Sequence, residues 1–193
     1  MAAIGEKKII KLLLTINRIN INLQNKDNWT PLLYITTNKV KEVVKLLLAV
    51  DGIDTNLQNK DGWTLLLCAA ANKAEEIVKL LLAVDGIDTN LQDKFGRTPL
   101  QHAAAIGEKE IIKLLLAVDR IDTNLQNKNN WTPLLYTVVN KTKKIIKLLF
   151  AVNRIDTNLQ NKNSWILLSY TATNKTEEII KLLLVVNKID TNL

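Results

Sequence analysis

The chain alternates short apolar runs with polar breaks, and this pattern predicts pairs of helices. Thr30 can cap a helix N-terminus and Pro31 suits the first helical turn, so the apolar run that follows predicts a short helix over residues 31–37. Asn38 breaks this run, and the next apolar stretch predicts a second helix over residues 41–50. Apolar residues cover too much of the second helix for it to have one wet face, so we expect it to lie between neighbouring units.

A turn and an extended segment follow each helix pair. Asp51 and Gly52 turn the chain, and residues 53–59 are expected to be extended up to a second turn near Gly62. The unit is therefore a helix–turn–helix followed by a hairpin-like finger. One unit alone cannot bury its apolar faces, whereas stacked copies can.

The unit recurs along the whole chain every 34 residues, without insertions. One position carries an asparagine in every copy: Asn22, Asn56, Asn90, Asn124, Asn158 and Asn192. Another position carries large side chains: Trp29, Trp63, Arg97, Trp131 and Trp165. The constant spacing implies structurally equivalent units in one array.

The repeat resembles the ankyrin repeat. The Thr-Pro-Leu opening of that family's signature occurs at residues 30–32, 98–100 and 132–134, and residues 101–104 continue it as Gln-His-Ala-Ala. Residues 111–116 resemble the family's second helix. The resemblance implies an all-α repeat fold, an ankyrin-type solenoid of stacked helix–turn–helix units with short β-hairpin-like fingers.

The resemblance also implies the domain organisation. Residues 1–193 are expected to form a single ankyrin-repeat solenoid with no separate second domain. It would contain a half-repeat over residues 1–21 and full repeats over about 22–55, 56–89, 90–123, 124–157 and 158–191. The array resembles those of large multidomain proteins, fungal ones among them, and we expect it to be an excerpt from a longer array.

Some repeats depart from the family pattern. The glycine between the two helices survives at Gly107 and is replaced elsewhere by Lys39, Lys73, Lys141 and Lys175. If that position needs a left-handed backbone, each lysine costs roughly 1 kcal/mol. Ile166 replaces the capping threonine, at a cost of about 1 kcal/mol. We therefore expect the repeat over residues 97–124 to be the best formed and the last repeat the weakest.

Composition argues against catalysis. His102 is the only histidine and has no nucleophile partner defined by the sequence, and Cys68, the only cysteine, cannot form an internal disulfide. Both occupy a position that carries tyrosine in other repeats, so we expect structural roles for them. Phosphate-loop and calcium-loop signatures are absent from the sequence. We expect no enzymatic activity, no cofactor and no metal site.

The N-terminus reaches charge at Glu6 and has no apolar core typical of a signal peptide. The longest apolar stretches are far too short to span a bilayer. We therefore expect an intracellular, cytoplasmic protein without a membrane partner.

By resemblance, the finger tips and the first helices of ankyrin proteins face a concave groove that binds partners. The corresponding positions here are Lys26, Lys60, Lys94, Lys128 and Lys162, Trp29, Trp63, Phe95, Arg97, Trp131 and Trp165, and Asn38, Asn72, Ile106, Asn140 and Asn174. The resemblance implies non-enzymatic binding of a protein partner. Tryptophan and arginine are enriched at binding hot spots, and the fingertip lysines would attract an acidic partner.

The four tryptophans have other interpretations that stay open. Each could pack on the finger of its neighbour, or could be the product of mutational drift from arginine. A drifted tryptophan could still bind a partner, so these interpretations do not exclude the first.

The charge distribution leaves two alternative functions. The net charge is +7, but residues 51–122 carry eight basic and twelve acidic residues, a net −4. Lysine columns with nearby tryptophans could bind single-stranded nucleic acid, although an acidic middle would interrupt a phosphate track, so nucleic acid is the less favoured partner. The other alternative is a structural array that self-associates through uncapped ends.

Overall fold

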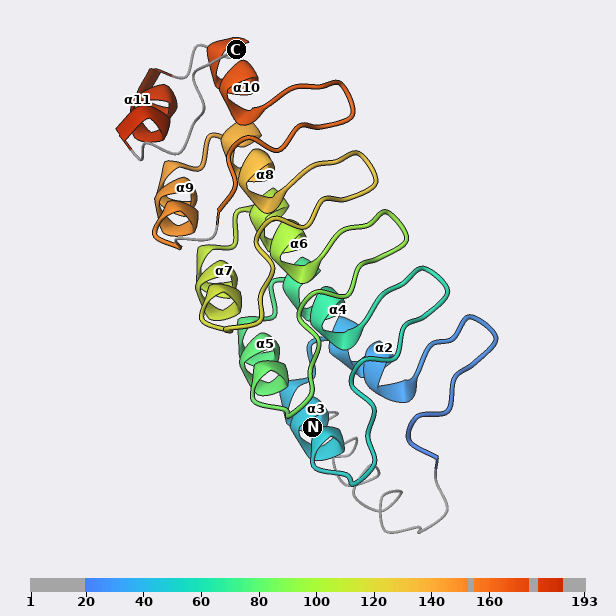
Figure 1. Ribbon diagram of the computed structural model, residues 1–193. Coiled ribbons are helices and arrows are strands. Elements are labelled where there is room, and N and C mark those ends of the chain that lie inside the picture. The colour runs from blue at the N-terminus through green and yellow to red at the C-terminus, as the bar shows by residue number, and fades with distance from the viewer. Residues whose placement is uncertain (1–19, 153–154, 174–176, 186–193) are drawn as a thin grey trace. The chain divides into compact units, whose positions relative to one another are not determined.

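The computed structural model describes residues 20–152, 155–173 and 177–185, and its regular elements there are all helices (Figure 1). The chain forms two compact units, residues 1–88 and 89–193, and their boundary lies close to an expected repeat boundary. The single solenoid and its exact repeat limits stay a prediction. Of the expected half-repeat over residues 1–21, all but the last two residues lie outside the described part of the chain.

The first unit contains two helix pairs. In the first pair, α2 (Pro31–Thr37) precedes α3 (Lys41–Leu48), and in the second, α4 (Leu65–Ala71) precedes α5 (Glu75–Leu82). Helix α2 packs on α4 and α3 packs on α5, so the first helices form one layer and the second helices another. A long loop, the finger, leads into each first helix and projects away from the second-helix layer (Figure 1).

The second unit repeats this arrangement with three pairs. They are α6 (Pro99–Ile106) and α7 (Lys109–Leu116), α8 (Pro133–Val139) and α9 (Lys143–Phe150), and α10 (Leu167–Thr173) and α11 (Glu177–Val185). Helix α8 packs on both α6 and α10, and α7 packs on α9. Both units therefore have two helical layers.

The predicted helices agree with the structure except at one end. Helix α2 has the predicted limits, but α3 ends at Leu48 rather than at residue 50. The N–H of Val50 bonds to the carbonyl of Leu47, and the N–H of Ile53 bonds back to Val50, so the chain is already turning. The apolar residues at the end of the predicted helix therefore belong to a turn.

Threonine side chains start the first helices. Thr30, Thr64, Thr98 and Thr132 each accept the backbone N–H three residues later, at 3.1–3.2 Å. At Thr98 the bond is reciprocal, because the Gln101 side chain accepts the N–H of Thr98 at 2.8 Å. Gln101 Nε2 also donates to the carbonyl of Trp131 in the next repeat, at 2.7 Å. This capping box agrees with the expectation that the central repeat is the best formed.

A left-handed residue follows the first helices at the position of the family's glycine, so the condition stated for the lysines there is met. Gly107 has φ +77°, and Lys39, Lys73 and Lys141 have φ between +55° and +60°. Lysine has a Cβ, so it is strained in this conformation where glycine is not. The fourth predicted lysine, Lys175, lies outside the described residues.

The core of each unit lies between its two helical layers. Leu66, Leu67 and Val78 are fully buried in the first unit, and Leu100 and Ile112 in the second. Fully burying one such side chain contributes about 1.5–3 kcal/mol.

The second helices bury a single face, formed in α3 by Val43, Val44 and Leu47, and they expose the opposite one, as at Glu42 and Lys45. The prediction that these helices have no wet face was therefore wrong, because the apolar residues outside that face are only partly buried.

The fingers are hairpin-like, although no β-strand forms in the parts of the chain that the structure describes. In the finger of residues 59–63, the N–H of Asn59 bonds to the carbonyl of Trp63 at 3.1 Å, and the N–H of Gly62 bonds to the carbonyl of Asn59 at 2.9 Å. The same pair of bonds closes the fingers of residues 25–29, 93–97, 127–131 and 161–165. Each finger is therefore a tight turn with too few paired residues to count as a strand.

The asparagine that marks the period joins consecutive repeats. Asn22 Nδ2 donates to the carbonyl of Gly52 at 2.7 Å, and Asn22 Oδ1 accepts the N–H of Asp54 at 2.9 Å. Asn56 and Asn90 make the same two bonds to the loop of the following repeat. The 34-residue period therefore reflects bonds between repeats as well as apolar packing.

Candidate functional site

The base of every described finger is organised by one short polar side chain. Asn25 Oδ1 accepts the backbone N–H groups of Asp27 and Trp29, both at 2.9 Å. Asn59, Asp93, Asn127 and Asn161 hold their own fingers in the same way. Because Oδ1 accepts two backbone N–H groups, the orientation of the side chain is fixed. Its other polar atom, Nδ2 of asparagine or Oδ2 of aspartate, then points toward the first helix.

In three repeats this second atom meets a tyrosine. Asn127 Nδ2 donates to the Tyr136 hydroxyl at 2.8 Å, and Asn161 Nδ2 donates to the Tyr170 hydroxyl at 2.6 Å. Asn25 makes the corresponding bond to Tyr34 at 3.2 Å. The asparagine thus ties each finger to the helix that follows it.

Three of the four tryptophans contact these tyrosines, one by stacking and two in tilted or edge-on pairs. The rings of Trp29 and Tyr34 are stacked with centroids 4.7 Å apart. In the second unit, Trp131 lies 5.0 Å from Tyr136 of its own repeat and 5.9 Å from Tyr170 of the next, and Trp165 lies 5.0 Å from Tyr170. Aromatic pairs at these distances contribute about 0.5–1.5 kcal/mol beyond burial. Trp29, Trp131 and Trp165 therefore contribute to packing, and Trp165 as a whole residue is still 38% exposed.

The central repeat replaces this set with an ionic one. Asp93 Oδ2 accepts a hydrogen bond from Arg97 Nε, and Arg97 Nη2 also lies 2.9 Å from it. His102 Nε2 lies 3.0 Å from the same oxygen. The Asp93 side chain is fully buried, whereas that of Arg97 is 31% exposed. Asp93, Arg97 and His102 occupy the positions of asparagine, tryptophan and tyrosine in the neighbouring repeat.

Burial and hydrogen bonding set the ionisation of this ionic set. Burial opposes the charge on Asp93, but hydrogen bonds from the Arg97 N–H, His102 and the Phe95 N–H outweigh it and hold the pKa of Asp93 below its usual value. Burial lowers the pKa of His102, the hydrogen bond to Asp93 partly offsets this, and the charge on Arg97 lowers the pKa further. His102 is therefore a neutral residue held next to an ionised carboxylate at pH 7.

The repeat of residues 56–89 has Asn59 and Trp63 but neither the tyrosine of the aromatic set nor the histidine of the ionic set. Cys68 stands where other repeats have tyrosine or histidine, and it is buried. Burial raises the pKa of its thiol to about 12, so it is not a reactive thiolate at neutral pH. Asn59 Nδ2, which would donate to a tyrosine hydroxyl here, is buried without a hydrogen-bond partner.

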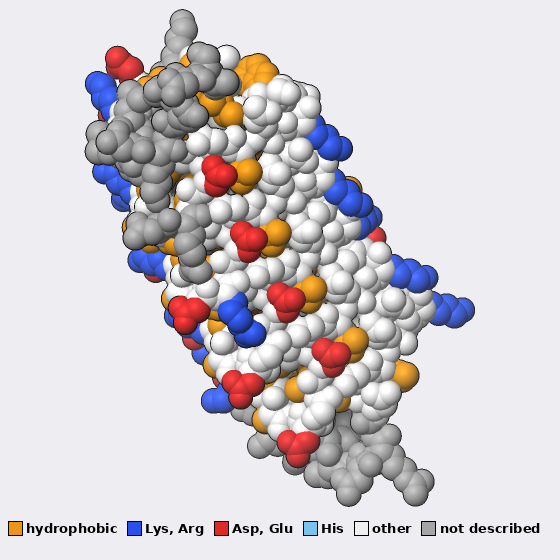
Figure 2. Space-filling view, in the orientation of Figure 1, with side chains coloured by type: hydrophobic (Ala, Val, Ile, Leu, Met, Phe, Trp, Pro, Cys, Tyr) orange, Lys and Arg blue, Asp and Glu red, His pale blue; other side chains and the backbone are white. Residues whose placement is uncertain are grey.

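The fingertips carry the exposed groups, and the two units differ there. In the second unit Phe95 is 52% exposed, with Lys94 Nζ 5.2 Å and Arg97 Cζ 4.9 Å from its ring centroid. The neighbouring tips expose Lys128 and Lys162. Figure 2 shows basic side chains projecting from the fingertips.

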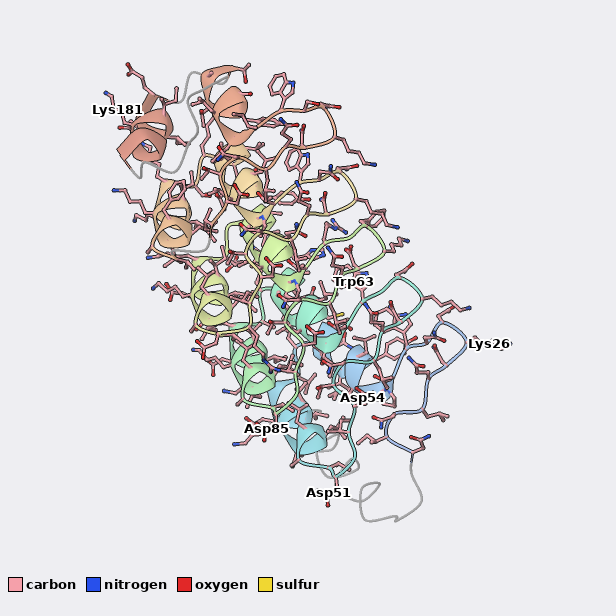
Figure 3. The ribbon with its side chains drawn as sticks, in the orientation of Figure 1. Lys26, Asp51, Asp54, Trp63, Asp85 and Lys181 are labelled. Atoms are coloured by element: carbon pink, nitrogen blue, oxygen red, sulfur yellow. The ribbon has the colours of Figure 1, made fainter. Side chains whose placement is uncertain are left out.

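The first unit carries mixed charge at its tips. Lys26 lies at a fingertip (Figure 3), and Lys60 Nζ lies 3.5 Å from Asp27 Oδ1 of the preceding finger. Asp61 is exposed on the same tip as Lys60. The fingertips of the second unit are therefore the more strongly basic of the two.

A protein-family model for ankyrin repeats in three copies matches residues 1–93 and 70–161, which together cover most of the chain. The chain belongs to the ankyrin repeat family. Ankyrin repeats generally serve as protein–protein interaction modules and are generally non-enzymatic.

Solved structures agree with this assignment. The ankyrin repeat protein EF0377 is 28% identical, with a TM-score of 0.85 over 94% of this chain and 94% of its own. An ankyrin repeat domain from Acinetobacter baumannii AYE is 26% identical, with a TM-score of 0.85 over 96% of this chain and 95% of its own. No curated protein matches the chain significantly.

Several of the ankyrin groove positions predicted from the sequence already have partners. Asn38 Nδ2 and Asn72 Nδ2 donate to the carbonyls of Tyr34 and Cys68, and so cap their own helices. Asn140 Nδ2 donates to Ala105 of the preceding repeat at 2.8 Å. Ile106 is 38% exposed, and Asn174 lies outside the described residues. The asparagines therefore stabilise the ankyrin scaffold, and the fingertips offer the more available groups.

Three positions of the ankyrin repeat are coupled in a way that was not predicted from the sequence. Residues 93, 97 and 102 form one contact set, and their equivalents in other repeats form another. A signal was present, because the three positions change together along the repeats: Asn-Trp-Tyr in three copies, Asp-Arg-His in one and Asn-Trp-Cys in one. Reading each position separately hides this relation.

The described residues contain no group of histidine, cysteine, aspartate or glutamate side chains that could hold a metal ion. Among them, no helix of the repeats is both long and apolar enough to cross a membrane.

Proposed function

We propose that this ankyrin array is a non-enzymatic module that binds an acidic segment of a protein partner at the fingertips of its second unit. The observation that carries the proposal is Phe95, an exposed ring flanked by two cations at the tip of a finger. An aromatic group held on a rigid finger can bury apolar area on binding with little loss of conformational freedom.

Neighbouring charges support the acidic partner. Lys128 and Lys162 are exposed at the next two tips, and those two fingers carry no acidic residue between positions 127–131 and 161–165. Positive potential on adjacent tips would steer a negatively charged segment and speed its association. In the first unit, Asp27 offsets Lys60.

The packing of the tryptophans changes how this proposal should be tested. Trp131 and Trp165 pack against tyrosine rings, so replacing them would loosen the fold as well as remove a contact surface. Phe95 and the fingertip lysines can be changed with less effect on stability because they are exposed.

The test is a comparison of three immobilised chains in cell extract, with and without nuclease treatment. One is the native chain, one carries Phe95→Ala with Lys128→Glu and Lys162→Glu, and one carries Lys144→Glu with Lys147→Glu on the exposed face of α9. We expect a protein retained by the native and α9 variants, and at least tenfold less of it on the fingertip variant.

Each other outcome has a definite meaning. Equal retention on all three chains, or equal loss on both variants, would contradict binding at the fingertips. Retention that disappears after nuclease treatment would indicate nucleic acid. Retention of further copies of this chain alone would indicate self-assembly.

A further inference from the structure

The repeat of residues 56–89 lacks a ring that its counterparts contain. In the last described repeat, Tyr170 makes edge-on contacts with both Trp131 and Trp165, with ring centroids 5.9 and 5.0 Å away. Its hydroxyl accepts a hydrogen bond from Asn161 Nδ2 at 2.6 Å. Three side chains therefore contact one phenol side chain. Three repeats earlier in the sequence, Cys68 takes the place of Tyr170.

The surrounding side chains are all retained at Cys68. Trp29 and Trp63 correspond to Trp131 and Trp165, and Asn59 corresponds to Asn161. All four residues belong to the first unit. Trp29 also keeps its contact with Tyr34 of its own repeat, at 4.7 Å. The sequence has thus lost the ring and kept the side chains that bind it elsewhere.

Asn59 shows that an acceptor is missing. Its Oδ1 accepts the N–H groups of Asp61 and Trp63, each at 2.9 Å, which fixes the direction of the amide. Its Nδ2 is buried and has no hydrogen-bond partner, although Asn59 as a whole is only 5% exposed. Unpaired buried donors are uncommon in folded proteins because their desolvation is not repaid. The thiol of Cys68 is a poor acceptor, and it stays protonated at neutral pH.

We propose that the position bordered by Trp29, Trp63, Asn59 and Cys68 binds a tyrosine side chain supplied by a protein partner. The phenol ring would contact both indoles, as Tyr170 does, and Asn59 Nδ2 would donate to its hydroxyl. The occupant is inferred from the chain itself, because equivalent side chains bind Tyr34, Tyr136 and Tyr170 in other repeats. The inference deepens the proposed function by naming a side chain of the partner, but its test needs no partner.

The site is closed in this structure. Cys68 is 2% exposed and Asn59 Nδ2 is shielded from solvent, so a ligand enters only after side chains rearrange. The cost of that rearrangement reduces affinity in proportion to the population of the open form. We therefore expect a single tyrosine analogue to bind in the millimolar range, with higher affinity only when the tyrosine belongs to a larger partner.

The experiment titrates the full chain with N-acetyl-tyrosinamide, N-acetyl-phenylalaninamide and p-cresol. Binding is followed by NMR at the side-chain amide of Asn59 and the indole N–H of Trp63. We expect saturable shifts at both groups, and a dissociation constant roughly tenfold lower for the tyrosine analogue than for the phenylalanine analogue, because its hydroxyl pairs with Asn59.

Two variants make the test specific. Cys68→Tyr places the ring in cis and should abolish binding of all three compounds while raising the thermal midpoint. Asn59→Asp keeps the Oδ1 bonds, as Asp93 does, but removes the donor, so it should abolish the preference for the tyrosine analogue.

Three results would overturn the proposal. The first is absence of binding to the native chain, and the second is equal binding to the Cys68→Tyr variant. The third is binding of p-cresol without N-acetyl-tyrosinamide, which would show that the site admits a free phenol but no residue of a partner. None of these results depends on the fingertip variants, so failure of the fingertip proposal remains distinguishable.

Discussion

At the scale of single residues, the finger base shows two ways of satisfying the same backbone. Asn127 donates to Tyr136, whereas Asp93 accepts from Arg97 and His102. In both, Oδ1 holds the finger closed. The change from an amide to a carboxylate reverses the role of the second atom, so the residues that contact it must change as well. The three positions are therefore energetically coupled.

This coupling can be measured by exchanging one set for the other. Asp93→Asn alone leaves Arg97 and His102 without their acceptor and should lower the free energy of unfolding by about 1–3 kcal/mol. The triple variant Asp93→Asn, Arg97→Trp and His102→Tyr restores the set found at residues 127, 131 and 136. It should cost at least about 1 kcal/mol less than the sum of the three single variants in urea denaturation. Additive effects would show that the positions are independent.

His102 also makes a pH dependence that can be assigned without ambiguity, because it is the only histidine. Its pKa in the folded chain is below the usual 6.5, so the unfolded chain binds a proton first as the pH falls. Stability is fully present above pH 6.5 and decreases below it, by at most about 1.4 kcal/mol per pH unit.

The measurement is the urea midpoint between pH 7 and pH 5, above the range in which most carboxylates titrate. We expect it to fall with acidification in the native chain and to stay nearly level in a His102→Tyr variant. The same slope in both chains would assign the titration to another group.

At the scale of elements, the sequence predicted the start of each helix better than its end. The Thr-Pro pairs at residues 30–31, 98–99 and 132–133 place the first helices correctly, because capping is a local interaction. The second helix ends two residues early at Leu48, where apolar residues continue into a turn. Hydrophobic pattern alone cannot place this end, because Ala49 and Val50 continue the apolar run although Ala49 is exposed and Val50 only partly buried.

The finger contacts were the least predictable part. Which side chain meets Asn59 or Asp93 depends on the packing of a loop against a helix nine residues later, and no local pattern records that contact. The strain at the lysines could be anticipated, because the family has glycine at their position. The backbone there stays left-handed even where lysine replaces the glycine.

The lysine strain gives a prediction for the helix turn. Lys141 has φ +55°, so Lys141→Gly should raise the free energy of unfolding by roughly 0.5–1 kcal/mol. The reverse change, Gly107→Lys, should lower the free energy of unfolding by a similar amount. Backbone strain is then the only cost, because a Cβ at Gly107 would meet only Thr142 Cγ2, at a contact distance of 4.0 Å. Denaturation midpoints of the two variants are the measurement. Shifts of equal sign in both would contradict backbone strain as the cause.

At the scale of the whole molecule, stability should vary along the array, because each repeat contributes its own terms and its contacts with its neighbours. The central repeat has a capping box, a glycine at the left-handed turn and the additional bonds of Gln101. In the last described repeat, α10 follows Ile166, whose side chain cannot cap a helix. Local opening should therefore be easiest in α10.

Hydrogen exchange measured by mass spectrometry can test this order directly. We expect amides of α6 and α7 to exchange at least tenfold more slowly than those of α10, since one missing cap alone is worth about 1 kcal/mol and further bonds add to it. Peptides from α8 and α9 serve as the internal control, with a capping threonine but a lysine at the turn, and should fall between the two. Uniform protection would contradict this order. It would mean that the second unit opens as one cooperative body, in which the stability lost with one cap is spread over all its repeats.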